Sequence, residues 1–233
     1  MKKLLKGAFQ FNETKCTIIA DKPEGIKAAE EAIRIHRQQL EQYIETHPKF
    51  SCTLEPFPAP DEPLVAKLMA MAAERANVGP MAAVAGVLAD LAVKDMLKVG
   101  CDVAVVENGG EISAMSNKPI DIALAAGDEP LSRRFGFRLT DFPIGVATSS
   151  GRFSHALSFG DAEAATVFCS DAGSADAAAT AVGNIVKGRD QRIAIQHGLD
   201  RAMSILGVEG VLVVYRGQVG TAGKIPKIIK IDQ

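Results

Sequence analysis

Two oxygen-bearing side chains stand one helical turn apart in the segment GSADAAATAVGN, residues 173–184. Asp176 and Thr180 occupy positions i and i+4, so in a helix their side chains share one face. A carboxylate and a hydroxyl are oxygen ligands that suit Mg²⁺, which usually completes its shell with water and substrate phosphates. The same spacing suits a helix in which Asp176 favours the dipole of the first turn and Thr180 bonds to the carbonyl one turn back. Spacing alone leaves both interpretations open.

The other residues of this segment are almost all Ala, Gly and Ser. Such small side chains let another helix or a ligand approach the backbone closely. The segment therefore predicts close helix packing, a homodimer face or a ligand site, without deciding among them.

A second group of polar residues follows a short predicted strand. The turn contains the three hydroxyls and one glycine of Thr148, Ser149, Ser150 and Gly151. These residues suit a backbone nest that binds an anion, and they are equally typical of a plain polar turn. His155 lies just beyond and is a candidate general acid or base because its ordinary pKa is near neutrality, although a lone histidine is often structural.

The sequence Asn108-Gly109-Gly110-Glu111 is a strong signal for a tight turn between two strands. Its backbone amides are able to come close to a ligand, and a plain hairpin explains the residues equally well. We keep Gly109, Gly110 and Glu111 as candidate ligand-binding residues.

Composition restricts the class of protein. Hydrophobic residues make up 47% of the 233 residues, charged residues make up 23%, and the formal net charge is -2. These values are typical of a globular protein and argue against a dedicated nucleic-acid binder. The segment MKKLLKGAFQFNETK lacks the apolar run of a signal peptide, and residues 81–97 are too polar and short for a membrane span. We therefore expect a cytoplasmic protein with no membrane or nucleic-acid partner.

The four cysteines, Cys16, Cys52, Cys101 and Cys169, lie far apart along the chain. They form no pair with metal-ligand spacing, so neither a zinc site nor a disulfide framework is predicted.

Hydrophobic periodicity and turn residues outline the elements. We expect a strand pair within residues 7–20 and a helix at 26–46, then a proline-rich connector at 50–63 that forbids a helix. Further helices are expected at 64–76 and 81–99, and further strands at 101–106, 120–125, 136–139, 145–148 and 165–169. This order predicts an α+β fold with a mostly antiparallel sheet and helix pairs. We treat residues 1–233 as one domain, with a hint of two pseudo-repeats at about 64–125 and 140–225.

Taken in order, four segments resemble the ApbE-like superfamily, which includes the FAD:protein FMN transferases. VVENGGEI at 105–112 resembles the family's N-x-G-G-D-I strand end, with Glu111 in place of the acid. ATSSG at 147–151 resembles its A-T-S-G turn, and ADAAAT at 175–180 resembles A-D-A-L-A-T. GPMAAVAG at 79–86 stands where the family has a small-residue segment ending in K-G.

The resemblance implies a T-fold-related α+β fold with a duplicated β-β-α-α-β-β unit. It further implies that Asp176 and Thr180 hold Mg²⁺ against the FAD diphosphate, together with a backbone carbonyl near Ala82. The implied cofactor-binding residues lie in two turns. The glycine turn consists of Gly109, Gly110 and Glu111, and the hydroxyl turn consists of Thr148, Ser149, Ser150 and Gly151.

The chain also departs from the transferase pattern. HALSFGDA at 155–162 keeps His155 but lacks the proline and acid of H-I-I-D-P-x-T-G, and Ala85 replaces the lysine of the K-G element. No lipoprotein cysteine lies near the start. These features are similar to a short cytoplasmic branch of the superfamily, some of whose archaeal relatives are linked to sulfide assimilation into homocysteine.

Two functions follow from the resemblance. One is a Mg²⁺-dependent transfer of FMN from FAD to a Ser or Thr of an acceptor protein, with His155 assisting proton transfer. The alternative is a protein that binds a flavin or another nucleotide without transferring it, for example as an accessory protein in sulfide assimilation. Either function requires a small-molecule ligand.

Overall fold

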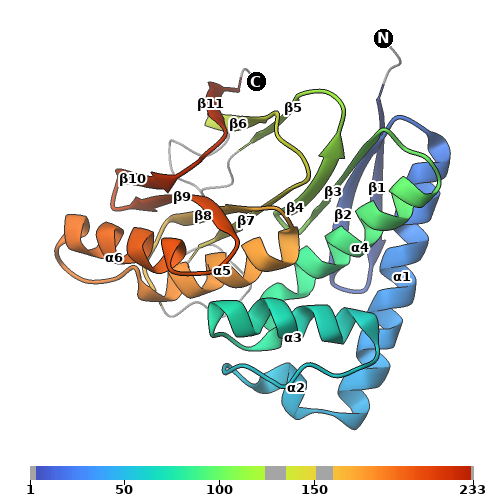
Figure 1. The fold of residues 1–233 in the computed structure, drawn as a ribbon, viewed down its shortest axis with the longest axis horizontal. Helices are drawn as coiled ribbons and strands as arrows, with labels where there is room; N and C mark the ends of the chain where they lie inside the picture. The colour runs from blue at the N-terminus through green and yellow to red at the C-terminus, as the bar shows by residue number, and fades with distance from the viewer. Residues whose placement is uncertain (1–3, 124–134, 151–159, 232–233) are drawn as a thin grey trace.

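A computed structural model describes residues 4–123, 135–150 and 160–231. Its centre is an eight-stranded, fully antiparallel sheet, bordered on one side by helices and on the other by a small second sheet (Figure 1). In sheet order its strands are β1 (Leu5–Phe11), β2 (Thr14–Ala20), β3 (Val103–Asn108), β4 (Glu111–Ser116), β7 (Ile144–Ser149), β8 (Ala164–Cys169), β9 (Val208–Tyr215) and β10 (Gln218–Gly223). The small sheet has the order β11 (Lys227–Lys230), β6 (Phe135–Leu139) and β5 (Ile120–Ala123).

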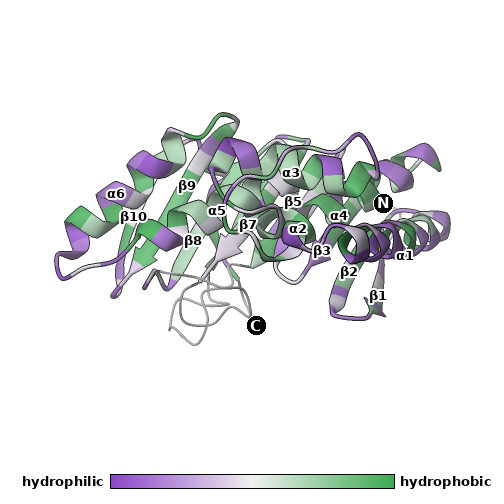
Figure 2. Cartoon of the chain, turned by 90° about the horizontal axis from the view of Figure 1, so that it is seen from below, coloured by the Kyte–Doolittle hydropathy of each residue, from purple (hydrophilic) through white to green (hydrophobic). Residues whose placement is uncertain are grey.

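The helices gather on one face of the large sheet (Figure 1). They are α1 (Pro23–Thr46), α2 (Lys49–Cys52), α3 (Leu64–Ala76), the 3-10 helix η1 (Pro80–Ala83), α4 (Val84–Lys98), α5 (Ala172–Ile185) and α6 (Gln191–Met203). Polar residues follow the outer surfaces of α1 and α6, while β9 beside α6 is mostly apolar (Figure 2). These amphipathic helices therefore turn their apolar faces to the sheet.

Side-chain alternation assigns each strand residue to one of the two faces. Val103 and Val105 of β3 belong to the apolar cluster shared with the small sheet. Ala104 and Val106 belong to the cluster under the helices. Asn108, two residues after Val106, therefore lies on the helix-covered face.

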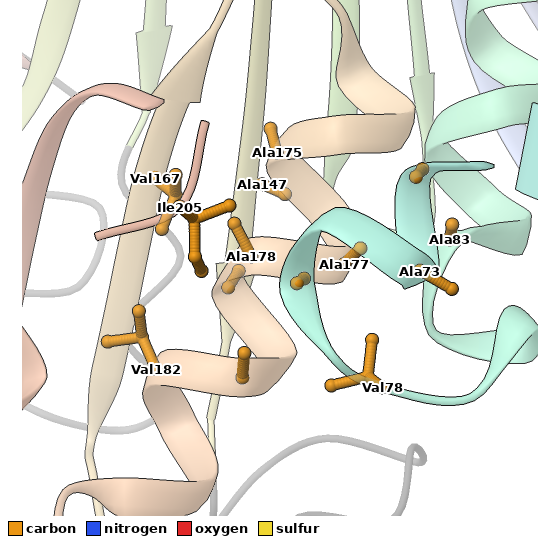
Figure 3. Packing of buried hydrophobic residues seen from close by; sticks show 14 of the residues in the cluster. Ala73, Val78, Ala83, Ala147, Val167, Ala175, Ala177, Ala178, Val182 and Ile205 are labelled. Atoms are coloured by element: carbon orange, nitrogen blue, oxygen red, sulfur yellow. The ribbon is translucent and has the colours of Figure 1, made fainter. Parts of the chain in front are cut away.

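The small-residue segment forms α5, which packs directly on the strands. Figure 3 shows Ala178 and Val182 of α5 near Val167 of β8 and Ile205, and Ala177 beside the end of α3. The helix starts at a capping residue, Asp171, whose carboxylate accepts a hydrogen bond from the Ser174 N–H at 2.7 Å. Small side chains thus serve close packing on this face of α5.

The α+β class and the mostly antiparallel sheet are confirmed. The helix expected at 64–76 is α3, and the strand pair expected within 7–20 is β1 with β2. The expectation of no helix in the connector was wrong for residues 50–52, which form part of α2. The prolines begin only at Pro56, and the fully buried Phe50 ring contacts the rings of Tyr43 and Phe57 edge-on.

The order of elements repeats along the chain. Residues 5–116 run through two strands, helices and two strands, and residues 144–223 do the same. The pseudo-repeats with bounds 64–125 and 140–225 stay a prediction, since the order of elements is compatible with a unit that starts earlier.

In the described part of the chain, no helix on its own has the length and apolar character needed to cross a membrane. Only α3 taken together with η1 and α4 reaches that length and hydropathy, and this pair is bent by 101°.

Candidate functional site

Asp176 lies on the second turn of α5, not at its start. Asp171 is the capping residue, and no acidic side chain occupies the first turn. The interpretation of Asp176 as a residue that serves the helix dipole is therefore wrong, because the effect fades beyond the first turn.

The Asp176 carboxylate contacts the start of α4. Its Oδ2 accepts a hydrogen bond from the Gly86 N–H at 3.0 Å. In a continuous helix that N–H would bond to the carbonyl of Ala82, four residues back. Here α4 begins only at Val84, after η1. The break between the two helices thus turns a backbone donor towards Asp176.

Asn108 of the sheet holds the start of α4, just after the break between η1 and α4. Its side-chain amide is buried and donates a hydrogen bond to the Ala85 carbonyl at 3.0 Å. Ala85 stands where the family pattern has lysine, and its backbone carries the contact. The last residue of β3 and the first turn of α4 are thereby held together.

Glu111 brings a second carboxylate to this place. It pairs with Asn108 in the β3–β4 register, so it lies on the same helix-covered face. Burial raises the pKa of Glu111 to about 7. Burial, followed by the negative charge of Glu111, raises the pKa of Asp176 well above its usual range. Glu111 is thus close enough to Asp176 for its negative charge to oppose the ionisation of Asp176.

No cationic side chain offsets these charges among the described residues, since neither carboxylate takes part in a salt bridge there. Thr180, one turn after Asp176, is partly exposed and has no hydrogen-bond partner within residues 4–123, 135–150 and 160–231. The expected bond from Thr180 to the carbonyl one turn back is therefore not formed. Glu111, Asp176 and Thr180 thus provide two carboxylates and one hydroxyl without a cationic partner in the described part of the chain.

The hydroxyl turn divides between the two faces of the sheet. Ser149 shares the helix-covered face with Ala147 and is partly exposed, whereas Thr148 lies on the opposite face. The Thr148 hydroxyl is 3.0 Å from that of Thr166 and lines a small cavity together with Glu107. The structure therefore does not bring Thr148 to Asp176.

The other residues predicted to bind a ligand lie in the β3–β4 turn, in η1 and just after β7. Gly109 and Gly110 form the β3–β4 turn with φ of 71° and 128°, a conformation that favours glycine. Ala82 is a partly exposed residue of η1. Ser150 is buried at the end of β7. Gly151 and His155 lie outside the described residues.

A third acid, Asp90, joins α4 to the start of α5. Its Oδ1 accepts bonds from the Ser113 hydroxyl at 2.7 Å and the Ala172 N–H at 3.0 Å, and its Oδ2 accepts from the Gly173 N–H at 2.8 Å. Burial raises the pKa of Asp90 to about 6. All its bonds go to protein donors, so Asp90 fixes the helix that carries Asp176.

The oxygens of Asp176, Glu111 and Thr180 are of the type that binds a hard cation. Among the described residues, no three His, Cys, Asp or Glu side chains form a metal-binding group. A metal here would therefore depend on hydroxyl or backbone oxygens as well as carboxylates. Mg²⁺ tolerates such a set because it retains water and binds one or two carboxylates.

The comparisons with known proteins place the chain in a family and agree with its fold. The family model described as AbpE bacteria matches residues 3–213. The chain belongs to this family. A UPF0280 protein of Methanosarcina acetivorans is 40% identical over 232 residues, which are 98% of this chain and 90% of that protein. A UPF0280 protein of Methanococcus vannielii is 40% identical over 235 residues, covering 99% of this chain and 95% of the relative.

Two solved structures of ApbE proteins share the fold of this AbpE-family chain. The apo form of the Pseudomonas stutzeri flavinyl transferase ApbE has a TM-score of 0.61 at 16% identity, and the match covers 94% of each chain. The ApbE protein of Thermotoga maritima has a TM-score of 0.61 at 14% identity, covering 98% of this chain and 97% of that one. The expected resemblance to the ApbE-like superfamily is confirmed.

Sequence reasoning missed two residues that position the candidate site of this AbpE-family chain. Asn108 was noted only as a turn residue, and Asp90 was considered only as part of the segment 81–97, which is too polar for a membrane span. The neighbours of both residues signalled contact with the interior, since Asn108 ends an apolar strand and Asp90 stands between Ala89 and Leu91. The partners of both residues are set by tertiary contacts.

Proposed function

We propose that the protein binds the diphosphate of a flavin nucleotide through Mg²⁺ at Asp176, Thr180 and Glu111, and that it transfers FMN from FAD to a Ser or Thr of an acceptor protein. One observation carries the proposal: burial, together with the Glu111 carboxylate, raises the pKa of Asp176, and Thr180 lies one helical turn after Asp176. In the described part of the chain, Thr180 has no hydrogen-bond partner and no cationic side chain offsets the two carboxylates. A bound cation stabilises both ionised carboxylates and the phosphates of a nucleotide.

The residues of the chain have separate roles in this proposal. The Gly86 N–H holds Asp176 Oδ2, so the carboxylate is oriented before a ligand arrives. Asn108 keeps the α4 start in place through the Ala85 carbonyl. Once bound, the cation supplies stabilisation of the negative charge that develops on the phosphate oxygens. The Ala82 carbonyl is the further oxygen ligand that the family resemblance implies.

The transfer step balances without a redox partner. The acceptor hydroxyl oxygen forms a bond to the FMN phosphorus, and the bond from that phosphorus to the AMP phosphate oxygen breaks. AMP leaves, and the hydroxyl proton passes to a base. His155 is the residue that we assign to this proton on the family resemblance. The flavinyl transferase of Pseudomonas stutzeri, whose fold the chain shares, supports the reaction class.

A second function is favoured by one feature of the sequence. HALSFGDA at 155–162 lacks the proline and acid that follow the histidine in the transferases. In this second proposal the site binds a flavin or another nucleotide without transfer, as an accessory protein in sulfide assimilation and homocysteine formation. It predicts binding without release of AMP.

The first experiment is a titration with FAD, with Mg²⁺ or with EDTA, followed by flavin fluorescence. We expect Mg²⁺-dependent binding in the native protein and at least tenfold weaker binding in Asp176→Asn. Asp200→Asn is the matched control, because it removes an exposed carboxylate on α6. Absence of Mg²⁺-dependent binding in the native protein would refute the site.

Transfer is tested separately. Native protein, FAD and Mg²⁺ are incubated with a cell extract, and the products are examined for AMP and for a flavin-fluorescent band on a denaturing gel. AMP together with a fluorescent band supports transfer. FAD binding with neither product supports the second function.

A further inference from the structure

A cavity separate from the candidate diphosphate site opens between α3, α4, the start of α5 and β4. Its volume is about 500 Å³, within the range of small-molecule sites. Its walls are mostly apolar, with contributions from Leu68 and Met71 of α3, Val93 and Leu97 of α4, and Met115 of β4. Met71 and Leu97 are 37% and 39% exposed, so the apolar wall is open to solvent.

Close helix packing separates this cavity from Asp176. A Cβ on Gly86 of α4 would lie 2.1 Å from the Ala172 carbonyl oxygen of α5. A Cβ on Gly173 would lie 2.6 Å from the Val87 side chain. The two helices therefore touch between the two sites. Asp176 contacts Gly86 on one side of this contact, and Asp90 lines the cavity on the other.

The charged groups of the cavity are of two kinds. Both Asp90 oxygens accept protein hydrogen bonds, and Asp171 Oδ1 accepts from the Ser174 N–H. Arg75 and Lys94 also line the cavity, and within the described residues neither belongs to an ion pair. The only hydrogen bond described for the Arg75 guanidinium goes to the Ser174 hydroxyl at 3.2 Å. Both Asp90 oxygens and one Asp171 oxygen are thus engaged, and the two cations are available for a ligand.

We propose that this cavity binds an amphipathic organic anion, whose apolar body lies against the α3–α4 wall and whose acidic group is held by Arg75 and Lys94. An apolar lining with a few polar groups that orient the ligand is the usual form of a small-molecule site. Guanidinium and ammonium groups bind carboxylate, sulfonate or phosphate by charge-assisted hydrogen bonds. The site requires neither FAD nor Mg²⁺.

The test uses 8-anilinonaphthalene-1-sulfonate, an aromatic sulfonate, without FAD or Mg²⁺. We expect its Kd to rise at least tenfold in the double variant Arg75→Gln, Lys94→Gln. The matched control is the double variant Lys187→Gln, Arg192→Gln, which removes two exposed cations elsewhere and should leave the Kd unchanged. The uncharged analogue N-phenyl-1-naphthylamine should bind at least tenfold more weakly and should not distinguish the variants.

Methyl-labelled methionine locates the bound probe. The chain has seven methionines, of which Met71 and Met115 line the cavity and Met203 lies at the end of α6. We expect the probe to shift the methyl signals of Met71 and Met115 and to leave that of Met203 unchanged. Shifts confined to other methionines, or equal affinity in the native protein and the Arg75/Lys94 variant, would overturn the proposal. An equal loss of affinity in the control variant would also overturn it.

Discussion

Replacing Glu111 with Gln tests whether two like charges face each other at the start of α4. Burial raises the pKa of Glu111 to about 7, and the charge of Glu111 contributes to the raised pKa of Asp176. Gln keeps the shape of the side chain and removes its charge. In the absence of divalent cations, we expect Glu111→Gln to be more stable than the native protein at pH 8.

The sign and size follow from the pKa in the two states. The ordinary pKa of the Glu111 carboxyl is 4.5, and its pKa in the folded protein is about 7. Between these two pH values the folded protein retains a proton on Glu111 that the unfolded chain has released. Stability from this proton is complete below pH 4.5 and is lost as the pH rises through 7. At 1.36 kcal/mol per pKa unit, the shift corresponds to at most about 3 kcal/mol. As the pH rises from 4.5 to about 8, the free energy of unfolding of the variant should therefore increase relative to that of the native protein by up to this amount.

Urea unfolding followed by circular dichroism at several pH values from 4.5 to 8, with EDTA, measures this difference. Glu45→Gln, at an exposed position of α1, is the matched control and should track the native protein. Addition of Mg²⁺ at pH 8 should stabilise the native protein more than the Glu111 variant. A difference between variant and native protein that does not change with pH, or a variant less stable at pH 8, would refute the reasoning.

Three further substitutions test the helices that carry the site. Gly86→Ala places a Cβ 2.1 Å from the Ala172 carbonyl oxygen, so urea unfolding should show a loss of about 1–3 kcal/mol; unchanged stability would argue against the close α4–α5 contact. Asp171→Ala removes the acceptor of the Ser174 N–H, and the same measurement should show a loss of about 1 kcal/mol. Thr180→Val should weaken Mg²⁺-dependent FAD binding at least tenfold while changing the free energy of unfolding by less than about 0.5 kcal/mol; native-like FAD affinity would remove Thr180 from the site.

Local sequence patterns were sufficient for many of the elements. The apolar period of residues 64–76 gave the bounds of α3, and the Asn-Gly pair at 108–109 marked the β3–β4 turn. The short α2 was missed because the prolines at 56–63 dominated the interpretation of a region in which Phe50 is buried by tertiary contacts. β11 was missed as well, since a four-residue exposed strand has little pattern of its own.

The candidate site was predictable only in part. Asp176 and Thr180 were identified from an i, i+4 spacing, which depends on one helix alone. The approach of Glu111 to Asp176 depends on the β3–β4 register and on the break before α4, and neither can be read from spacing. The position of Thr148 on the opposite face of the sheet depends on where β7 begins, because a shift of one residue exchanges the two faces.

Packing and the proposed ligand binding, the two interpretations of GSADAAATAVGN, concern different faces of one helix. Ala177 and Ala178 are fully buried against α3 and the strands, and there the small side chains serve contact (Figure 3). Asp176 and Thr180 are partly exposed and lie outside that packed surface. Because Gly173 and Gly86 allow α5 and α4 to touch, the Gly86 N–H reaches Asp176 directly. The close packing of α5 is therefore what places its carboxylate beside Glu111, and a bulkier helix would separate the two groups on which the proposed Mg²⁺ site depends.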